Sequence, residues 1–119
     1  MTIIEVIKNK KQFLSLLLLA DEQENMIDRY LERGTMYVLN DNGVKAECVV
    51  TDECNGILEI KNIATVPEYQ GKGYFSKLMK FMLNDLKQRG IVRVTLGVEP
   101  AEETNKKIYV HYGFNEYIK

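Results

Sequence analysis

Two turn signals divide the middle of the chain into three strand-like runs, and no other feature constrains the fold as much. Asn40-Asp41-Asn42-Gly43 separates residues 35–39 from residues 44–51, and Asn55-Gly56 separates that second run from residues 57–66. The runs are rich in the β-branched side chains that strands favour. Short turns of this kind join antiparallel neighbours, so the pattern predicts a meander of three consecutive strands.

Helical periodicity flanks this meander on both sides. In residues 22–33 the apolar side chains recur every three or four positions, and a second stripe runs from Phe75 to Leu86 and is closed by Arg89-Gly90. The chain therefore predicts one mixed α/β layer structure. Its elements are a strand (2–7), two helices (10–20 and 22–33), the three strands, the helix after Gly73, a strand (91–98), a helix (102–112) and a strand (114–118).

Size and charge limit what the protein can be. At 119 residues, the whole span 1–119 is expected to form a single domain. The 16 basic and 17 acidic residues are well mixed and give a net charge of −1. This balance argues against a surface that follows nucleic-acid phosphates.

The N-terminus and the cysteines argue against a signal peptide and against a zinc site. Basic residues before residues 13–20 resemble a signal peptide, but the apolar run Leu16–Leu19 is too short to span a bilayer, so we expect a cytoplasmic protein without membrane attachment. Cys48 and Cys54, with one His in the chain, do not make a convincing zinc site. We expect two reduced thiols and no metal.

The segment Gln70-Gly71-Lys72-Gly73 lies between a strand and a helix and is the main candidate for ligand binding. The first amides of a helix lack intrahelical partners and carry partial positive charge, so they can hold phosphate oxygens. Taken alone, this signal is weak. No Gly-Lys-Ser/Thr follows, which argues against a nucleoside-triphosphate loop, and a dinucleotide fingerprint would need a third glycine.

The surrounding sequence is more specific. Residues 60–78, IKNIATVPEYQGKGYFSKL, resemble the acetyl-CoA-binding motif of the GCN5-related N-acetyltransferase (GNAT) superfamily, Gln/Arg-x-x-Gly-x-Gly/Ala. Residues 108–114, IYVHYGF, resemble its second landmark, a Tyr four residues before a Gly-Phe pair. The resemblance covers nearly the whole chain. It implies a mostly antiparallel central sheet flanked by helices.

The resemblance also implies a set of site residues. A bulge in the fourth strand would open a slot beside the fifth, and the pantetheine arm of acetyl-CoA would pair there with main-chain groups of Ile63, Ala64 and Thr65. Amides along the glycine segment would hold the pyrophosphate, namely those of Gln70, Gly71, Lys72, Gly73, Tyr74 and Phe75. Tyr109 would protonate the leaving thiolate.

Transfer to an amine also needs a proton acceptor, because an alkylamine is protonated at neutral pH. Glu59 is the candidate, since it stands 11 residues before Gln70, where the histone-modifying branch of the superfamily carries its catalytic Glu. The alternative for Glu59 is an exposed strand residue, and the alternative for Tyr109 is a core aromatic. His111 is expected to be structural or at the surface.

Three departures from the family pattern keep a second interpretation open. Phe75 stands where the signature has Gly or Ala, and Glu102 where the family often has a cofactor-contacting Asn. The family's seventh strand is not found after Phe114, and strand exchange in a homodimer is one way to fill its place. The sequence thus predicts an N-acetyltransferase acting on a primary amine of a small molecule or protein. The alternatives are a non-catalytic acyl-CoA-binding module and a domain without a cofactor.

Overall fold

A five-stranded sheet in the order β1-β2-β3-β4-β5 organises the molecule, whose computed structural model describes residues 1–91 and 93–96. The first four strands pair antiparallel, and β5 runs parallel to β4. The strands are β1 (Thr2–Val6), β2 (Thr35–Asn40), β3 (Val44–Asp52), β4 (Ile57–Thr65) and β5 (Arg93–Leu96). The helical elements are η1 (Lys10–Phe13), α1 (Leu14–Leu17), α2 (Glu24–Ile27), η2 (Pro67–Tyr69) and α3 (Tyr74–Gln88). The predicted helix 102–112 and strand 114–118 lie outside the described residues.

The predicted meander is confirmed as β2, β3 and β4. Both turns contain the left-handed backbone that their sequences favour, with positive φ at Asn42 and Gly43 in the first turn and at Asn55 and Gly56 in the second. The mixed α/β class with a mostly antiparallel sheet is therefore confirmed.

The two long helices predicted before the meander are wrong in extent. The segment predicted as 10–20 is a short η1 followed by one turn of α1, and only Glu24–Ile27 of residues 22–33 is α-helical. A long-range contact joins these segments instead: the Lys10 ammonium donates hydrogen bonds to the carbonyl oxygens of Leu31, at 3.0 Å, and Gly34, at 2.6 Å. Of the predicted apolar stripe, Ile27, Tyr30 and Leu31 are nevertheless buried, whereas Met26 is 37% exposed.

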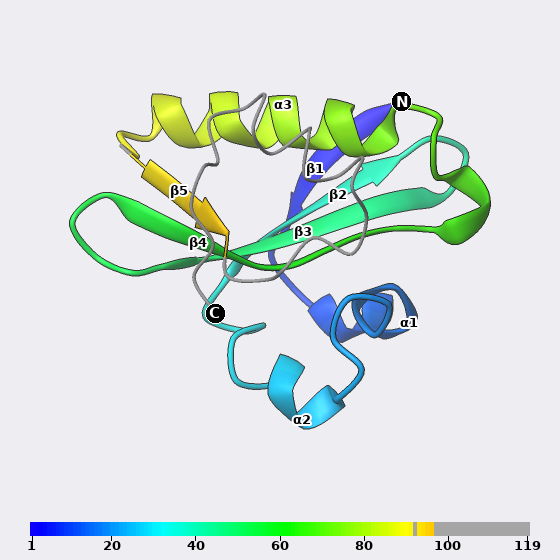
Figure 1. Ribbon diagram of the computed structural model, residues 1–119, viewed down its shortest axis with the longest axis horizontal. Helices are drawn as coiled ribbons and strands as arrows, with labels where there is room; N and C mark the ends of the chain where they lie inside the picture. The colour runs from blue at the N-terminus through cyan, green and yellow to red at the C-terminus, as the bar shows by residue number, and fades with distance from the viewer. Residues whose placement is uncertain (92, 97–119) are drawn as a thin grey trace.

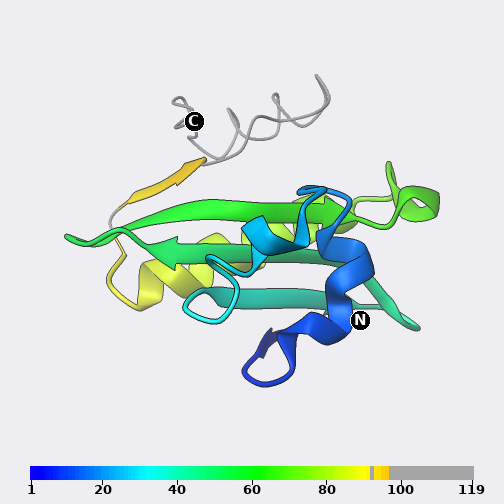
Figure 2. The same ribbon diagram turned by 90° about the horizontal axis from the view of Figure 1, so that it is seen from below.

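Helical elements cover both faces of the sheet. Figure 1 shows α3 along one face and α1 with α2 below the other, and Figure 2 gives the same arrangement from below. The α3 face is packed as predicted, with Leu78, Met79, Met82 and Leu86 buried against the strands. Leu17, Ile27 and Leu31 pack on the opposite face.

A local irregularity in β4 positions the site. Val50 pairs with Ile60 while Val49 pairs with Asn62, so Lys61 is left without a partner in β3. An extra residue of this kind is a β-bulge, which bends the strand. Within the described residues, β4 pairs with β5 only from Ile57 to Ile60. The bulged Lys61 directly follows the last β4 residue whose β5 partner is among the described residues.

Candidate functional site

The glycine segment forms an open backbone turn at the start of α3. Gly71 has φ 78° and Gly73 has φ 85°, values that L side chains rarely adopt. No heavy atom lies within 4 Å of a Cβ built at either position, once the adjoining residues are left out, so space remains beside the backbone. Gly73 is also the N-cap of α3 and supplies no side-chain cap to the first helical amides. A polyphosphate fits this turn, because the amides and the helix dipole both favour negative charge.

Two lysines bring positive charge to the same turn. The Nζ of Lys45, on β3, lies 3.9 Å from the ring centroid of Tyr69, and the Nζ of Lys72 lies 5.6 Å from it. Both are cation–π contacts with one ring. The sequence singled out Lys72, whereas Lys45 comes from 27 positions earlier in the chain and was missed.

The side chains of Tyr74 and Phe75, the last two residues predicted to hold pyrophosphate, contact other parts of the protein. The Tyr74 hydroxyl donates to the Oδ2 of Asp41 at 2.7 Å, and this hydrogen bond raises the pKa of Tyr74. Phe75 is partly buried and packs against the core under α3. Because its ring is packed there, the departure from Gly or Ala does not by itself place a bulky group over the turn.

Ile63, Ala64 and Thr65 occupy the end of β4 beyond the bulge. They pair with Cys48, Glu47 and Ala46 of β3 on one side, and none of the described residues pairs with them on the β5 side. A strand directs its main-chain groups alternately to its two sides, so this segment also directs groups away from β3. The Gln70 Nε2 donates to the Thr65 carbonyl at 3.4 Å and links this edge to the glycine turn.

Glu59 is buried, which excludes the exposed alternative. It retains 6% of its exposure and stands between Thr51 of β3 and Thr95 of β5 in the strand register. Its carboxylate forms an ion pair with the Nζ of Lys61, the bulged residue. Glu59 and Ile63 lie on the same strand on either side of the bulge. Tyr109, Glu102 and His111 lie outside the described residues.

The sequence analysis missed a second acidic group, Glu47 of β3. It is fully buried, and burial raises its pKa well above the ordinary value. Ala64, its partner in β4, belongs to the segment just described. An acidic residue inside the apolar run 44–50 was the available signal, but a strand pattern alone does not say whether such a residue faces solvent or the core.

The two cysteines, the acidic and histidine side chains and the helices of the described residues give three further findings. Cys48 is buried, Cys54 is exposed, and both are free. Among residues 1–91 and 93–96, no three His, Cys, Asp or Glu side chains gather as a metal ion would need. None of the helices in this part of the chain has both the length and the hydropathy to span a bilayer.

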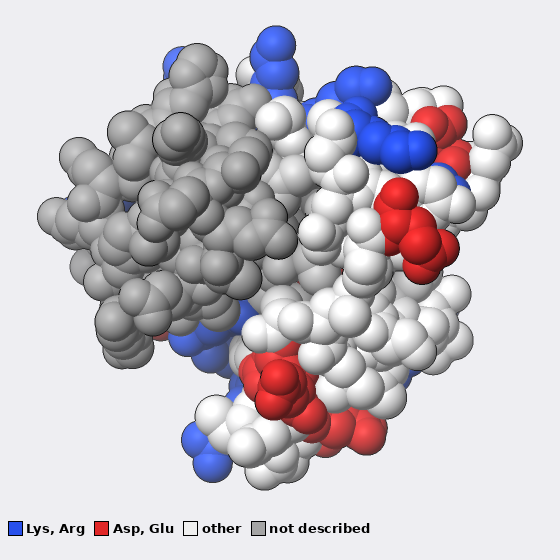
Figure 3. All heavy atoms as spheres, turned by 45° about the vertical axis from the view of Figure 1, so that its right-hand side comes forward, with Lys and Arg blue, Asp and Glu red and all other residues white. Residues whose placement is uncertain are grey.

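The surface shown in Figure 3 carries both signs of charge. On the described part of that face, acidic and basic side chains lie in small separate groups with uncharged atoms between them.

Sequence and structure comparisons place the chain among acetyltransferases. A sequence profile described as the Acetyltransferase (GNAT) family matches residues 8–114. The ribosomal protein bS18-alanine N-acetyltransferase of Escherichia coli K12 is 29% identical over 92 residues, or 77% of this chain, and the match covers 60% of that enzyme.

Two solved structures share the fold. An IAA acetyltransferase from Bacillus cereus superposes with a TM-score of 0.82 at 30% identity, covering 94% of this chain and 76% of the other. A GNAT family acetyltransferase from Elizabethkingia anophelis, solved with acetyl-CoA bound, gives 0.84 at 27% identity, covering 94% and 74%. The match to the family profile spans most of the chain, and the glycine turn and the bulged β4 follow the family pattern. The chain belongs to the GNAT family of acetyltransferases.

Proposed function

We propose that the protein is an acetyl-CoA-dependent N-acetyltransferase that moves an acetyl group directly to a primary amine of a small molecule or protein. The observation that carries this proposal is the continuity of the glycine turn with the end of β4 beyond the bulge. Gln70 joins the two through its contact with Thr65. A relative of the same family was solved with acetyl-CoA bound, which supports the cofactor.

The binding roles follow from the two parts of this surface. The amides from Gln70 to Phe75 hold the pyrophosphate, with Lys72 and Lys45 as nearby cations. The main-chain groups of Ile63, Ala64 and Thr65 that point away from β3 hold the amide-rich arm as an added strand would be held. Bound acetyl-CoA supplies a thioester carbonyl that an amine can attack.

The proton transfers are assigned to two side chains. Glu59 accepts the proton of the amine, directly or through a water, and Lys61 keeps the carboxylate oriented by its ion pair. Tyr109 donates a proton to the departing thiolate. Main-chain amides near Ile63 stabilise the charge that develops on the carbonyl oxygen.

Thiol release from acetyl-CoA over a panel of primary amines tests this function. The wild-type chain should release thiol with at least one amine, and Tyr109→Phe should lower the rate by roughly 10²- to 10⁴-fold. Acetyl-CoA binding without thiol release for any amine would favour the non-catalytic acyl-CoA-binding module instead. An unchanged rate in Tyr109→Phe would remove this residue from the mechanism.

We also propose where the protein is found in the cell and how it assembles. We infer a cytoplasmic protein from the mixed surface charge and the relatives' acceptors, one of which is a ribosomal protein. A homodimer is supported by β1, which among the described strands pairs with β2 alone and exposes Ile4 at 54%, so a second copy can add along this edge. Light scattering tests the dimer, and a monomer mass at high protein concentration would contradict it.

A further inference from the structure

The glycine turn, residues 70–73, has little in its own sequence to fix its conformation. Gly71 and Gly73 have positive φ, and glycine has access to more backbone conformations than any other residue. Gln70 adds one exposed hydrogen bond of 3.4 Å to the Thr65 carbonyl. A loosely held turn must be ordered when it binds a ligand, and that ordering lowers affinity. The residues on either side of the turn are therefore the ones that can hold it in place.

Tyr74, the first residue of α3, is held from the turn between β2 and β3. Its hydroxyl donates to the Oδ2 of Asp41 at 2.7 Å, across 33 positions of the chain. A hydrogen bond to a carboxylate is shorter and stronger than one between neutral groups. Figure 1 shows the β2–β3 turn at the end of the sheet where α3 begins. The contact therefore fixes the start of α3, where the glycine turn ends.

Tyr69, the residue before the glycine turn, is held from the same hairpin. The Lys45 ammonium lies 3.9 Å from the centroid of its ring and donates to the Asn42 carbonyl at 3.2 Å. Lys45 retains 8% of its exposure, and a cation–π contact is stronger where water is excluded. The rings of Tyr69 and Tyr74 also meet edge to face, with centroids 6.3 Å apart. The two tyrosines beside the glycine turn therefore contact each other and one hairpin.

The β2–β3 turn is itself ordered by short-range hydrogen bonds. The Asn40 Oδ1 accepts from the Gly43 amide at 3.1 Å, and the Asp41 amide donates to the Gly43 carbonyl at 2.9 Å. Asn42 and Gly43 have the positive φ that such a turn requires. Asp41 and Lys45 are therefore presented by a hydrogen-bonded hairpin of the sheet.

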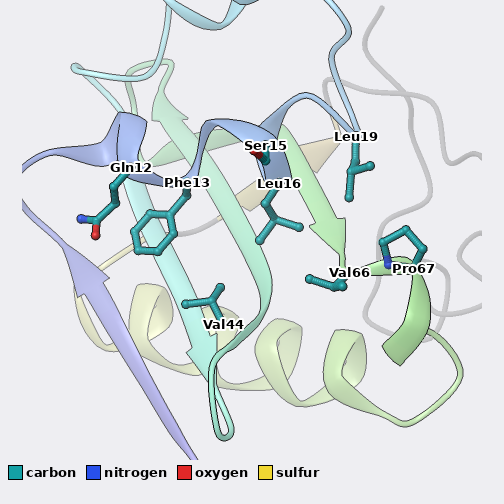
Figure 4. Close-up of a pocket in the computed structure, with 8 residues that line it drawn as sticks. All are labelled: Gln12, Phe13, Ser15, Leu16, Leu19, Val44, Val66 and Pro67. Carbon is teal, nitrogen blue, oxygen red and sulfur yellow. The ribbon is translucent and has the colours of Figure 1, made fainter.

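Packing on the α1 side of η2 is incomplete. An apolar pocket of about 300 Å³ separates η1 and α1 from Val44, Val66 and Pro67. Figure 4 shows these three side chains around the pocket, with Pro67 at the start of η2. The Val66 amide donates to the Lys45 carbonyl at 2.9 Å and joins the main chains there. Because close packing does not fix η2 on this side, the contacts of Tyr69 have more influence on its position.

We propose that Asp41 and Lys45 are positioning residues for the cofactor, which act through Tyr74 and Tyr69 to hold the glycine turn in the conformation that binds pyrophosphate. Neither is assigned a role at the reacting atoms. The inference rests on the proposed acetyl-CoA-dependent function, and it extends the cofactor site to a hairpin that the glycine motif does not include.

Calorimetric titration of acetyl-CoA into the full chain tests the proposal with a matched pair of tyrosines. Tyr74→Phe removes the hydroxyl that donates to Asp41, and Tyr37→Phe removes one that donates to the Oδ2 of Asp85 on the same helix, also at 2.7 Å. Tyr74→Phe should weaken acetyl-CoA binding roughly tenfold, because a hydrogen bond to a charged group is lost. Tyr37→Phe should leave the affinity unchanged, although urea unfolding should show a loss of stability in both variants.

Variants of Asp41 and Lys45 separate positioning from other effects. Asp41→Leu should match Tyr74→Phe, and the double variant should bind no more weakly than either, because all three lack the same contact. Asp41→Asn keeps an acceptor oxygen and should retain most of the affinity. Lys45→Met should weaken binding in the wild type and have little further effect in Tyr69→Leu, where the ring is already absent.

Each part of the proposal has a result that would overturn it. Equal affinity in the wild type, Tyr74→Phe and Asp41→Leu would remove Asp41 from the cofactor site and leave the proposed function intact. An equal loss in Tyr37→Phe and Tyr74→Phe would mean that general stability limits binding. A full effect of Lys45→Met in Tyr69→Leu would mean that this lysine acts on the phosphates directly. Absence of acetyl-CoA binding to the wild type would contradict the proposed function, and this inference with it.

Discussion

At the scale of single residues, Glu47 is the side chain most at odds with its surroundings. Burial raises its pKa, so in the absence of a cation the native protein holds a proton that the unfolded chain would release near the ordinary Glu pKa of about 4.3. Cys48 and Tyr30 are also buried, and burial raises the pKa of each. Those two groups therefore do not add charge changes near neutral pH.

We expect Glu47→Gln to change how stability depends on pH. Above about pH 4.3 the native state of the wild type binds more protons than the unfolded state. Its free energy of unfolding therefore falls as pH rises, by up to about 1.4 kcal/mol per pH unit, until the pH exceeds the raised pKa of Glu47. Glu47→Gln should lack this fall. Urea unfolding between pH 5 and pH 8 measures it, with Glu22→Gln as the control. A constant difference between wild type and Glu47→Gln across this range would contradict the account.

At the scale of elements, one buried lysine joins η1 to the turn before β2. Lys10 retains 6% of its exposure, and its ammonium donates to the carbonyls of Leu31, Glu32 and Gly34. Lys11 is adjacent in sequence but exposed, and it pairs with Glu24 and Asp28 at the surface. Lys10 therefore donates to main-chain carbonyls that no regular helix pairs, whereas Lys11 makes ion pairs that solvent screens.

Lys10→Met should therefore destabilise the protein far more than Lys11→Met. Loss of the Lys10 ammonium leaves buried carbonyl oxygens without donors, at a cost of roughly 2–4 kcal/mol. Chemical denaturation of both variants gives the comparison. A loss for Lys10→Met no larger than that for Lys11→Met would mean that this contact does not hold η1 to the turn before β2.

The same contact explains which elements the sequence could predict. Strands β2 to β4 and helix α3 follow from local signals, since their turns and apolar stripe are complete within a few residues. The helices predicted at 10–20 and 22–33 were wrong in extent, and the residues around them are joined by Lys10 across more than 20 positions, which no local pattern can show. Lys10 and Lys11 are indistinguishable in the sequence, so no periodicity could have shown which of them turns inward.

At the scale of the whole molecule, the candidate site joins parts that are far apart in the chain. The glycine turn was predicted from its own residues and from its resemblance to a family. The cation Lys45 and the acid Glu47 come from β3 and reach the site only through the register of the sheet. A strand pattern does not disclose that register, and this is why the turn was found and its neighbours were missed. Tyr109 remains a prediction.

Two glycines with similar backbone conformations lie at the two ends of α3. Gly73 and Gly90 have φ 85° and 88°, and no heavy atom lies within 4 Å of a Cβ built at either one, their chain neighbours set aside. Alanine at each should cost a similar 1–2 kcal/mol of backbone strain. Only Gly73 adjoins the proposed pyrophosphate site, so the two substitutions separate strain from binding.

Calorimetric titration of acetyl-CoA into the wild type, Gly73→Ala and Gly90→Ala tests the central claim most directly. The wild type should bind, and a hundredfold excess over its Kd should raise the free energy of unfolding by about 2.7 kcal/mol. Gly73→Ala should bind at least tenfold more weakly, while Gly90→Ala should match the wild type. No binding to the wild type at millimolar acetyl-CoA, or equal affinities in all three proteins, would contradict a pyrophosphate site at Gln70–Phe75.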